Sequence, residues 1–230
     1  MRKLNKKKNI ATILGLLSLL LMVGSAAAYF TDMEEAKNHL TIGKVDITLT
    51  EPKWDDLPQK EKEDITPNKT LIKDPKVTNT GINDAFVFVS VEVPVANVIT
   101  AKEDGGRNSK ALTELFSWTV NSGWVRIGDI QDVKNENDLV TAHRYLYVYG
   151  SSETCTPLKK DAVTPELFSQ VVFANVIEGE VLPDGTPMET SAQDINLRAY
   201  AIQTTDLTDR DVSDPASVWK VFENQNKESF

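Results

Sequence analysis

The sequence predicts an all-β fold: an antiparallel β-sandwich of the jelly-roll type with short helical insertions, preceded by a signal-peptide helix. Apolar and polar residues alternate with a period of two in several segments, which is typical of strands with one buried face. Clusters of Asn, Gly, Asp and Pro separate these segments, and long charged loops connect them. An immunoglobulin-like sandwich has the same signature and stays open as an alternative.

The first expected strands lie in the N-terminal half of the chain. Val45–Thr50 alternates strictly and predicts a half-buried strand. Thr70–Thr78 leads into a turn-forming cluster, Asn79–Asp84, and a third strand follows at Ala85–Val93. In this third strand, valines line one face and two phenylalanines lie on the other, which predicts a central strand buried on both faces. We expect the second and third strands to pair as a hairpin.

The middle of the chain mixes helix and strand signals. Ser109–Phe116 has helical character, and Trp118–Ile127 predicts a small second hairpin around the turn Asn121–Gly123. Val140–Tyr149 predicts a strand with three tyrosines on one face and Leu and Val on the other. We interpret the tyrosine row as cross-strand packing with hydroxyl groups at the rim, rather than as a ligand site.

The C-terminal part predicts two strands and two helices. Thr164–Glu166 resembles a helix start, with Thr as N-cap and Pro in the first turn. Val171–Val176 and Ile195–Thr204 are strand-like. Asp214 is expected to cap a short helix that runs to Phe222 and seals an open end of the sheet pair with its apolar face.

The N-terminus has the pattern of an export signal. Five basic residues precede Ile10–Val23, a 14-residue stretch without a charge, whereas a spanning helix needs roughly 20 apolar residues. A single-pass anchor is therefore the weaker alternative. Four small residues suited to signal peptidase follow: Ser25, Ala26, Ala27 and Ala28. We expect cleavage after Ala27 or after Ala28. The expected organisation is a signal peptide (1–27), an N-terminal arm (28–43), a β-sandwich domain (44–223) and a polar tail (224–230).

The net charge and the cysteine content limit which partners and which environment suit the mature chain. The signal peptide carries five positive charges and no negative ones, so cleavage takes the formal net charge from −9 to −14. Such an acidic chain is a poor partner for nucleic acid or anionic membranes. Cys155 is the only cysteine and cannot form an intrachain disulfide, so stability must come from a core. We expect it in a loop, with an intermolecular bridge as the alternative.

The sequence contains no recognisable catalytic motif. The only histidines, His39 and His143, lie far apart in sequence and neither belongs to a His-Glu-x-x-His motif. There is no Gly-x-Ser-x-Gly motif and no phosphate-binding loop. A calcium site at the acidic cluster Asp206–Asp214 is a minor alternative, since its spacing differs from that of an EF-hand. We therefore expect no enzyme activity, no catalytic residues, no metal and no cofactor.

Several segments resemble a known family. The sequence is similar to TasA and camelysin-type secreted proteins of Gram-positive bacteria, whose signal peptides are cut by a SipW-type peptidase, and within them to the BsaA-like biofilm-matrix branch. The block around the cleavage site is the most specific part of this resemblance. The matching segments are 27–32, Asn38, 40–47, 64–68, 73–75, 77–81, 84–89 and 199–203.

The resemblance implies a secreted jelly-roll subunit that polymerises into extracellular biofilm-matrix or surface fibres. The arm released by cleavage would act as a donor strand for the next subunit, so the partners would be the chain itself, the signal peptidase and other matrix proteins. Residues Thr31–Lys37 favour a helix or a mobile arm in the monomer. A camelysin-like surface metallopeptidase and a monomeric surface-binding module remain as alternatives. The residues expected to act in peptidase recognition or strand donation are Tyr29, Phe30, Thr31, Asp32, Leu40 and Ile42.

Overall fold

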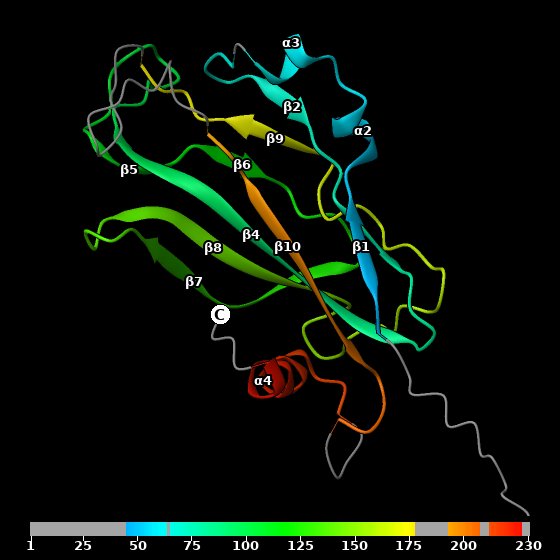
Figure 1. The fold of residues 1–230 in the computed structure, drawn as a ribbon. Helices are drawn as coiled ribbons and strands as arrows, with labels where there is room; N and C mark the ends of the chain where they lie inside the picture. Colours follow the sequence, from blue (N-terminus) through cyan, green and yellow to red (C-terminus); the bar gives the residue numbers. More distant parts are fainter. Residues whose placement is uncertain (1–44, 64, 178–192, 208–211, 227–230) are drawn as a thin grey trace, which may run out of the picture. The chain divides into compact units, whose positions relative to one another are not determined.

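The computed structural model describes residues 45–63, 65–177, 193–207 and 212–226 (Figure 1). The expected signal peptide, its cleavage residues and the arm lie outside these ranges. The described residues belong to one unit, Gly43–Phe230. Their strands are β1 (Ile47–Thr50), β2 (Thr70–Ile72), β3 (Lys76–Asn79), β4 (Ala85–Val98), β5 (Ala111–Glu114), β6 (Phe116–Trp118), β7 (Trp124–Lys134), β8 (Val140–Tyr149), β9 (Gln170–Phe173) and β10 (Asn196–Gln203); their helices are α2 (Pro52–Asp55), α3 (Gln59–Lys62) and α4 (Pro215–Asn226).

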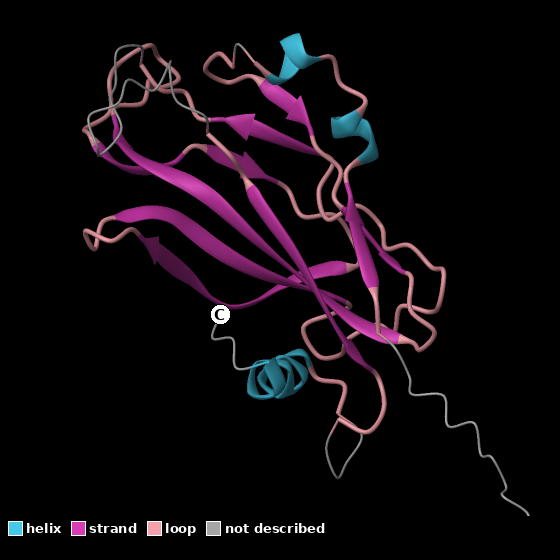
Figure 2. Ribbon diagram, viewed as in Figure 1, coloured by secondary structure: helices cyan, strands magenta, loops and turns pink. Residues whose placement is uncertain are grey.

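These strands form three antiparallel sheets, which confirms the expected all-β fold with short helices. The largest sheet has the order β10-β4-β8-β7, and β5 pairs with the C-terminal part of β4. A second sheet consists of β1 and β3, and the third has the order β2-β9-β6. Figure 2 shows the two smaller sheets on one side of the large sheet and helix α4 on its other side.

Strand β4 is the centre of the fold and is buried on both faces, as its sequence predicts. Val87, Val89, Val91 and Val93 belong to the main core, which is shared with residues of β3, β6 and β9. On the opposite face, Phe86 and Phe88 belong to a second core, with residues of β8, β10 and α4. The alternation of side chains along one strand therefore supplies both hydrophobic layers.

Helix α4 covers the second core. Asp214 Oδ1 accepts a hydrogen bond from Ser217 N at 3.0 Å, so the expected N-cap is confirmed. The buried face of the helix includes Trp219, whose ring lies 5.1 Å from that of Phe88 on β4. The helix extends to Asn226 and packs on a face of the large sheet, whereas we expected it to end at Phe222 and to seal an end of the sheet pair.

Both expected hairpins are wrong. Thr70–Thr78 is divided by Lys73-Asp74-Pro75 into β2 and β3, which lie in different sheets, and neither of them pairs with β4. Proline lacks the N–H that a continuous ladder needs at this point. Likewise, β6 and β7 flank the turn at Asn121–Gly123 but pair with β9 and β8, respectively.

Two expected helices are also wrong. Ser109–Phe116 instead contains β5, which pairs with β4, and the first residue of β6. Thr164 does not cap a helix. Its N–H donates to Val77 O at 2.9 Å and its Oγ1 accepts from Val77 N at 3.0 Å, so this segment lies extended beside β3.

Candidate functional site

The described part of the chain holds one cluster of chemically active side chains around a histidine. Glu114 at the end of β5, Asp132 on β7, and His143 and Tyr145 on β8 form this carboxylate–histidine cluster. Asp132 and His143 are opposite each other in the β7–β8 ladder. His143 Nδ1 donates to Glu114 Oε1 at 2.7 Å, and its Nε2 lies 3.6 Å from Asp132 Oδ1. The imidazole is thus held between two carboxylates.

Tyr145 completes the cluster. Its hydroxyl donates a short hydrogen bond to the same Glu114 oxygen. Burial, followed by this hydrogen bond to a carboxylate, raises the pKa of Tyr145 above its ordinary value. The hydroxyl therefore stays protonated and serves as a donor that fixes Glu114. The tyrosine row on β8 packs against the main core, as its sequence predicts.

A second feature is a polar groove over the outer face of β6 and β9. It has a volume of about 260 Å³. Asn121 and Ser169 also line an adjoining hollow with Lys76 and Glu166. The residues that line the polar groove are Ser117, Trp118, Thr119, Asn121, Ser169, Gln170 and Val172.

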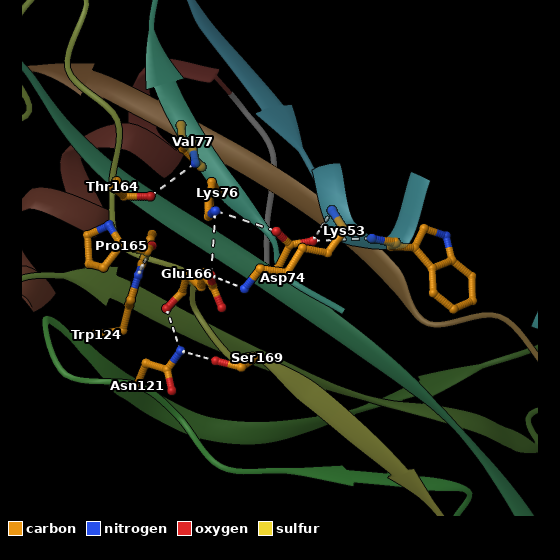
Figure 3. Close-up of polar contacts among 11 residues, drawn as sticks. Lys53, Asp74, Lys76, Val77, Asn121, Trp124, Thr164, Pro165, Glu166 and Ser169 are labelled. Carbon is orange, nitrogen blue, oxygen red and sulfur yellow. Dashed lines mark hydrogen bonds and ion pairs between the residues drawn. The ribbon is translucent and has the colours of Figure 1, made fainter. Parts of the chain in front are cut away.

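The segment 165–169 contributes Ser169 to the polar groove and is tied to the turn after β6 (Figure 3). Asn121 Nδ2 donates to Glu166 O at 3.1 Å and to Ser169 Oγ at 3.0 Å. Trp124 Nε1 donates to Pro165 O at 2.9 Å. Gly123 has φ +90°, and a Cβ there would lie 3.2 Å from Pro165 Cγ, so glycine permits this close approach.

An ion-pair network borders the adjoining hollow (Figure 3). Glu166 Oε1 lies 2.6 Å from Lys53 Nζ and 3.5 Å from Lys76 Nζ. The hydrogen bond from Lys53 is the main cause that lowers the pKa of Glu166. Lys76 Nζ also lies 3.4 Å from Oδ2 of the buried Asp74. The charges of this network are therefore largely compensated within it.

The sheet edges matter for association with another chain. Among the described strands, β1, β2, β5, β6, β7 and β10 each have a ladder on one side only, and β3 pairs with β1 and makes an isolated bridge on its other side. A register shift between Ile127 and Gln131 interrupts β7, and charged residues occur along it. Such irregular, charged edges disfavour pairing. β2 and β6 lie on either side of β9 and lack such a bulge.

Comparison with known proteins identifies the family. The model of the camelysin metallo-endopeptidase family matches residues 3–162, well over half of the chain. The chain belongs to the camelysin family. A search of curated proteins and a search of solved structures each gave no match. The family match supports a surface or matrix protein, and no helix among the described residues is long and apolar enough to cross a membrane.

The family's description corrects our expectation that the chain is not an enzyme, because it names a metallo-endopeptidase. We therefore tested the carboxylate–histidine cluster as a zinc site. Catalytic zinc in peptidases is held by three protein ligands. Only Asp132 lies near Nε2 of His143, and Glu114 contacts the other ring nitrogen, so the three side chains do not converge on one point. Within the described ranges no group of three His, Cys, Asp or Glu residues could hold a metal ion.

The sequence-predicted site residues of this camelysin-family chain lie outside the described residues. They are the cleavage residues Ser25–Ala28 and the arm residues Tyr29–Asp32, Leu40 and Ile42, and His39 lies outside as well. Cys155 is described and is buried, with its Sγ free. Sequence reasoning missed Glu114, because a helix was expected there; alternation along β5 and β6 was the signal that could have placed it on a strand.

Proposed function

We propose that the chain is a secreted structural subunit of extracellular biofilm-matrix or surface fibres, which polymerises by donating its N-terminal arm to a neighbouring subunit. The observation that supports this most directly is the presence of single-sided strands in the described sheets, at β2 and β6. An added strand satisfies the exposed N–H and C=O groups of such an edge. The arm, residues 28–43, directly precedes the segment that leads into β1.

The arm is long enough to act as a donor strand. Its 16 residues would extend to roughly 50 Å at ~3.3 Å per residue. Each backbone hydrogen bond to an acceptor edge contributes ~0.5–1.5 kcal/mol, and each large apolar side chain that becomes fully buried adds ~1.5–3 kcal/mol. Phe30, Leu40 and Ile42 are the apolar anchors in this proposal.

Export would create this arm. We propose that a SipW-type signal peptidase cuts after Ala27 or Ala28, that the mature protein has no stable membrane span, and that other matrix proteins bind the fibre. Intact-mass measurement of the secreted protein should give an N-terminus at Ala28 or Tyr29. A retained signal peptide would instead support an anchored surface protein.

Electron microscopy tests the polymerisation. The mature protein, residues 28–230, should form filaments, and deletion of residues 28–38 should give a monomer with an unchanged circular dichroism spectrum. Phe30→Asp should shorten or abolish the filaments, because a charge would enter a buried pocket. Asp32→Asn at a polar arm position is the matched control. Filaments of normal length from the truncated protein would refute strand donation.

A second candidate function is that of a camelysin-like surface metallopeptidase, which the family's description favours. Casein cleavage that is blocked by a chelator and restored by zinc would support it. The variant His143→Ala should then lose activity if the described histidine contributes to the metal site. A filament-free, inactive protein would point to the third alternative, a monomeric surface-binding module.

A further inference from the structure

Three of the residues that line the polar groove have uncharged hydrogen-bonding side chains without a described partner. Ser117 and Thr119 on β6 and its extension, and Gln170 on β9, are exposed. The side chains of these three residues make no hydrogen bond to another described residue. Each hydroxyl can donate one hydrogen bond and accept two, and the amide of Gln170 can donate and accept at the same time. These groups are available to a ligand.

The register places these groups on one face of the sheet. Ser117 is opposite Val172, and Val172 is opposite Thr70 on the far strand. Gln170 is likewise opposite Ile72. Since alternate residues of a strand share a face, the outer face combines hydroxyl and amide groups with short aliphatic side chains. The inner face of the same strands belongs to the main core.

The polar groove is preformed. Two of its lining residues, Asn121 and Ser169, are joined by a hydrogen bond at 3.0 Å, and Asn121 also donates to Glu166 O (Figure 3). Beneath it, on the inner face of β6, the ring of Trp118 packs against the main core 5.5 Å from that of Phe168, and its Nε1 donates to the Tyr147 hydroxyl. A ligand would therefore meet walls that are already ordered, which lowers the entropic cost of binding.

The charge of the lining selects the class of ligand. The chain is acidic overall, yet none of the residues that line the polar groove is charged. In the adjoining hollow, Glu166 already pairs with both Lys53 and Lys76. A phosphate, a polyanion or a cation would find no counter-charge here. A polyol, in contrast, offers hydroxyl groups that match Ser, Thr and Gln, and C–H faces that pack on Val172.

We propose that the polar groove binds a neutral polysaccharide. Its volume of about 260 Å³ is slightly below that of typical ligand pockets, which span roughly 300–1,000 Å³, so it accommodates only a short stretch of the polymer. Ser117, Thr119 and Gln170 supply the contacts to sugar hydroxyls. This binding does not depend on polymerisation, because all of its residues belong to a single chain.

Saturation-transfer NMR tests this on the mature chain, whether it is monomeric or polymeric. The probes are cellohexaose, isomaltohexaose, mannohexaose and hexa-N-acetylchitohexaose, with tetragalacturonate as a charged comparison. At least one neutral probe should receive saturation, and tetragalacturonate should not. The variant Ser117→Ala/Thr119→Ala/Gln170→Ala should bind that neutral probe at least tenfold more weakly.

A matched variant controls for loss of surface polarity elsewhere. Thr48→Ala/Thr50→Ala/Gln131→Ala changes exposed strand residues outside the polar groove and should bind as the unmodified chain does. Both variants should keep the circular dichroism spectrum, since exposed substitutions disturb folding little. The proposal is overturned if no neutral probe receives saturation, if only tetragalacturonate does, or if the groove variant binds as tightly as the control variant.

Discussion

Replacement of Asp74 by alanine should be among the most damaging single changes to this fold. The carboxylate is fully buried, in the link between β2 and β3. Its Oδ1 accepts from Lys53 N at 2.9 Å and from Trp54 N at 3.3 Å, and these two N–H groups open helix α2. Asp74 thus acts as a cap supplied by a distant segment, and it joins the residues after β1 to β3.

The magnitude follows from these contacts. A hydrogen bond to a charged group contributes about 1.5–3 kcal/mol, and removal of one partner of a buried ion pair costs about 3–5 kcal/mol. Two features reduce the loss: Lys76 is partly exposed, and Asp74 Oδ2 has no hydrogen-bond partner, so its burial is itself unfavourable. We expect Asp74→Ala to lower the free energy of unfolding by about 3 kcal/mol, and Asp74→Asn, which keeps an acceptor oxygen, by about half of that.

Urea denaturation followed by tryptophan fluorescence measures this loss. With a slope of about 2–3 kcal/mol/M, the midpoint of Asp74→Ala should fall by about 1 M or more. Asp84→Ala is the matched control, because its ion pair with Lys159 spans 3.5 Å between exposed side chains and should contribute under about 0.5 kcal/mol. Equal midpoints for the two alanine variants would refute the assigned role of Asp74.

Three further outcomes are expected. Burial, with a smaller effect of Asp214, raises the pKa of the Cys155 thiol to about 12, so native protein should react with a thiol reagent only after unfolding; a native disulfide dimer would contradict this. Because the pKa of Cys155 is raised above the ordinary 9.0, its contribution to the free energy of unfolding is complete below pH 9 and is lost as the pH rises toward 12. Alkaline unfolding of Cys155→Ala, compared with that of the unmodified chain, measures this loss. Trp219→Ala should lower the free energy of unfolding by about 3–4 kcal/mol in the urea assay, since its ring packs on Phe88, Tyr200 and Phe222; a loss under 1 kcal/mol would show that α4 hardly contributes.

The faces of the strands could be predicted from the sequence, but their partners could not. The period of two in β4 and β8 is a local property, and it correctly placed the valines of β4 on the face opposite Phe86 and Phe88, and the tyrosines of β8 together on one face. Pairing was inferred from proximity along the chain, and this inference failed because the connections around both predicted turns cross between sheets. Glu114, His143 and Asp132 meet only through the pairing of β4, β5, β7 and β8, so sequence spacing could not have indicated their cluster.

The segments that follow β3 and β6 show why closeness along the chain did not predict which strands pair. Asn121 was correctly interpreted as a turn residue, whereas Asn79 is the last residue of β3, and the side-chain amides of both bond to distant backbone. Asn79 is fully buried, and its Nδ2 donates to Leu158 O at 2.8 Å while its Oδ1 accepts from Gly81 N. Asn121 makes the corresponding bond to Glu166 O at 3.1 Å. A hairpin turn needs no such partner, because its strands satisfy each other's backbone groups. A side-chain amide that bonds across the fold therefore holds each crossing between sheets in place: the buried Asn79 does so after β3, and the half-buried Asn121 does so at the polar groove.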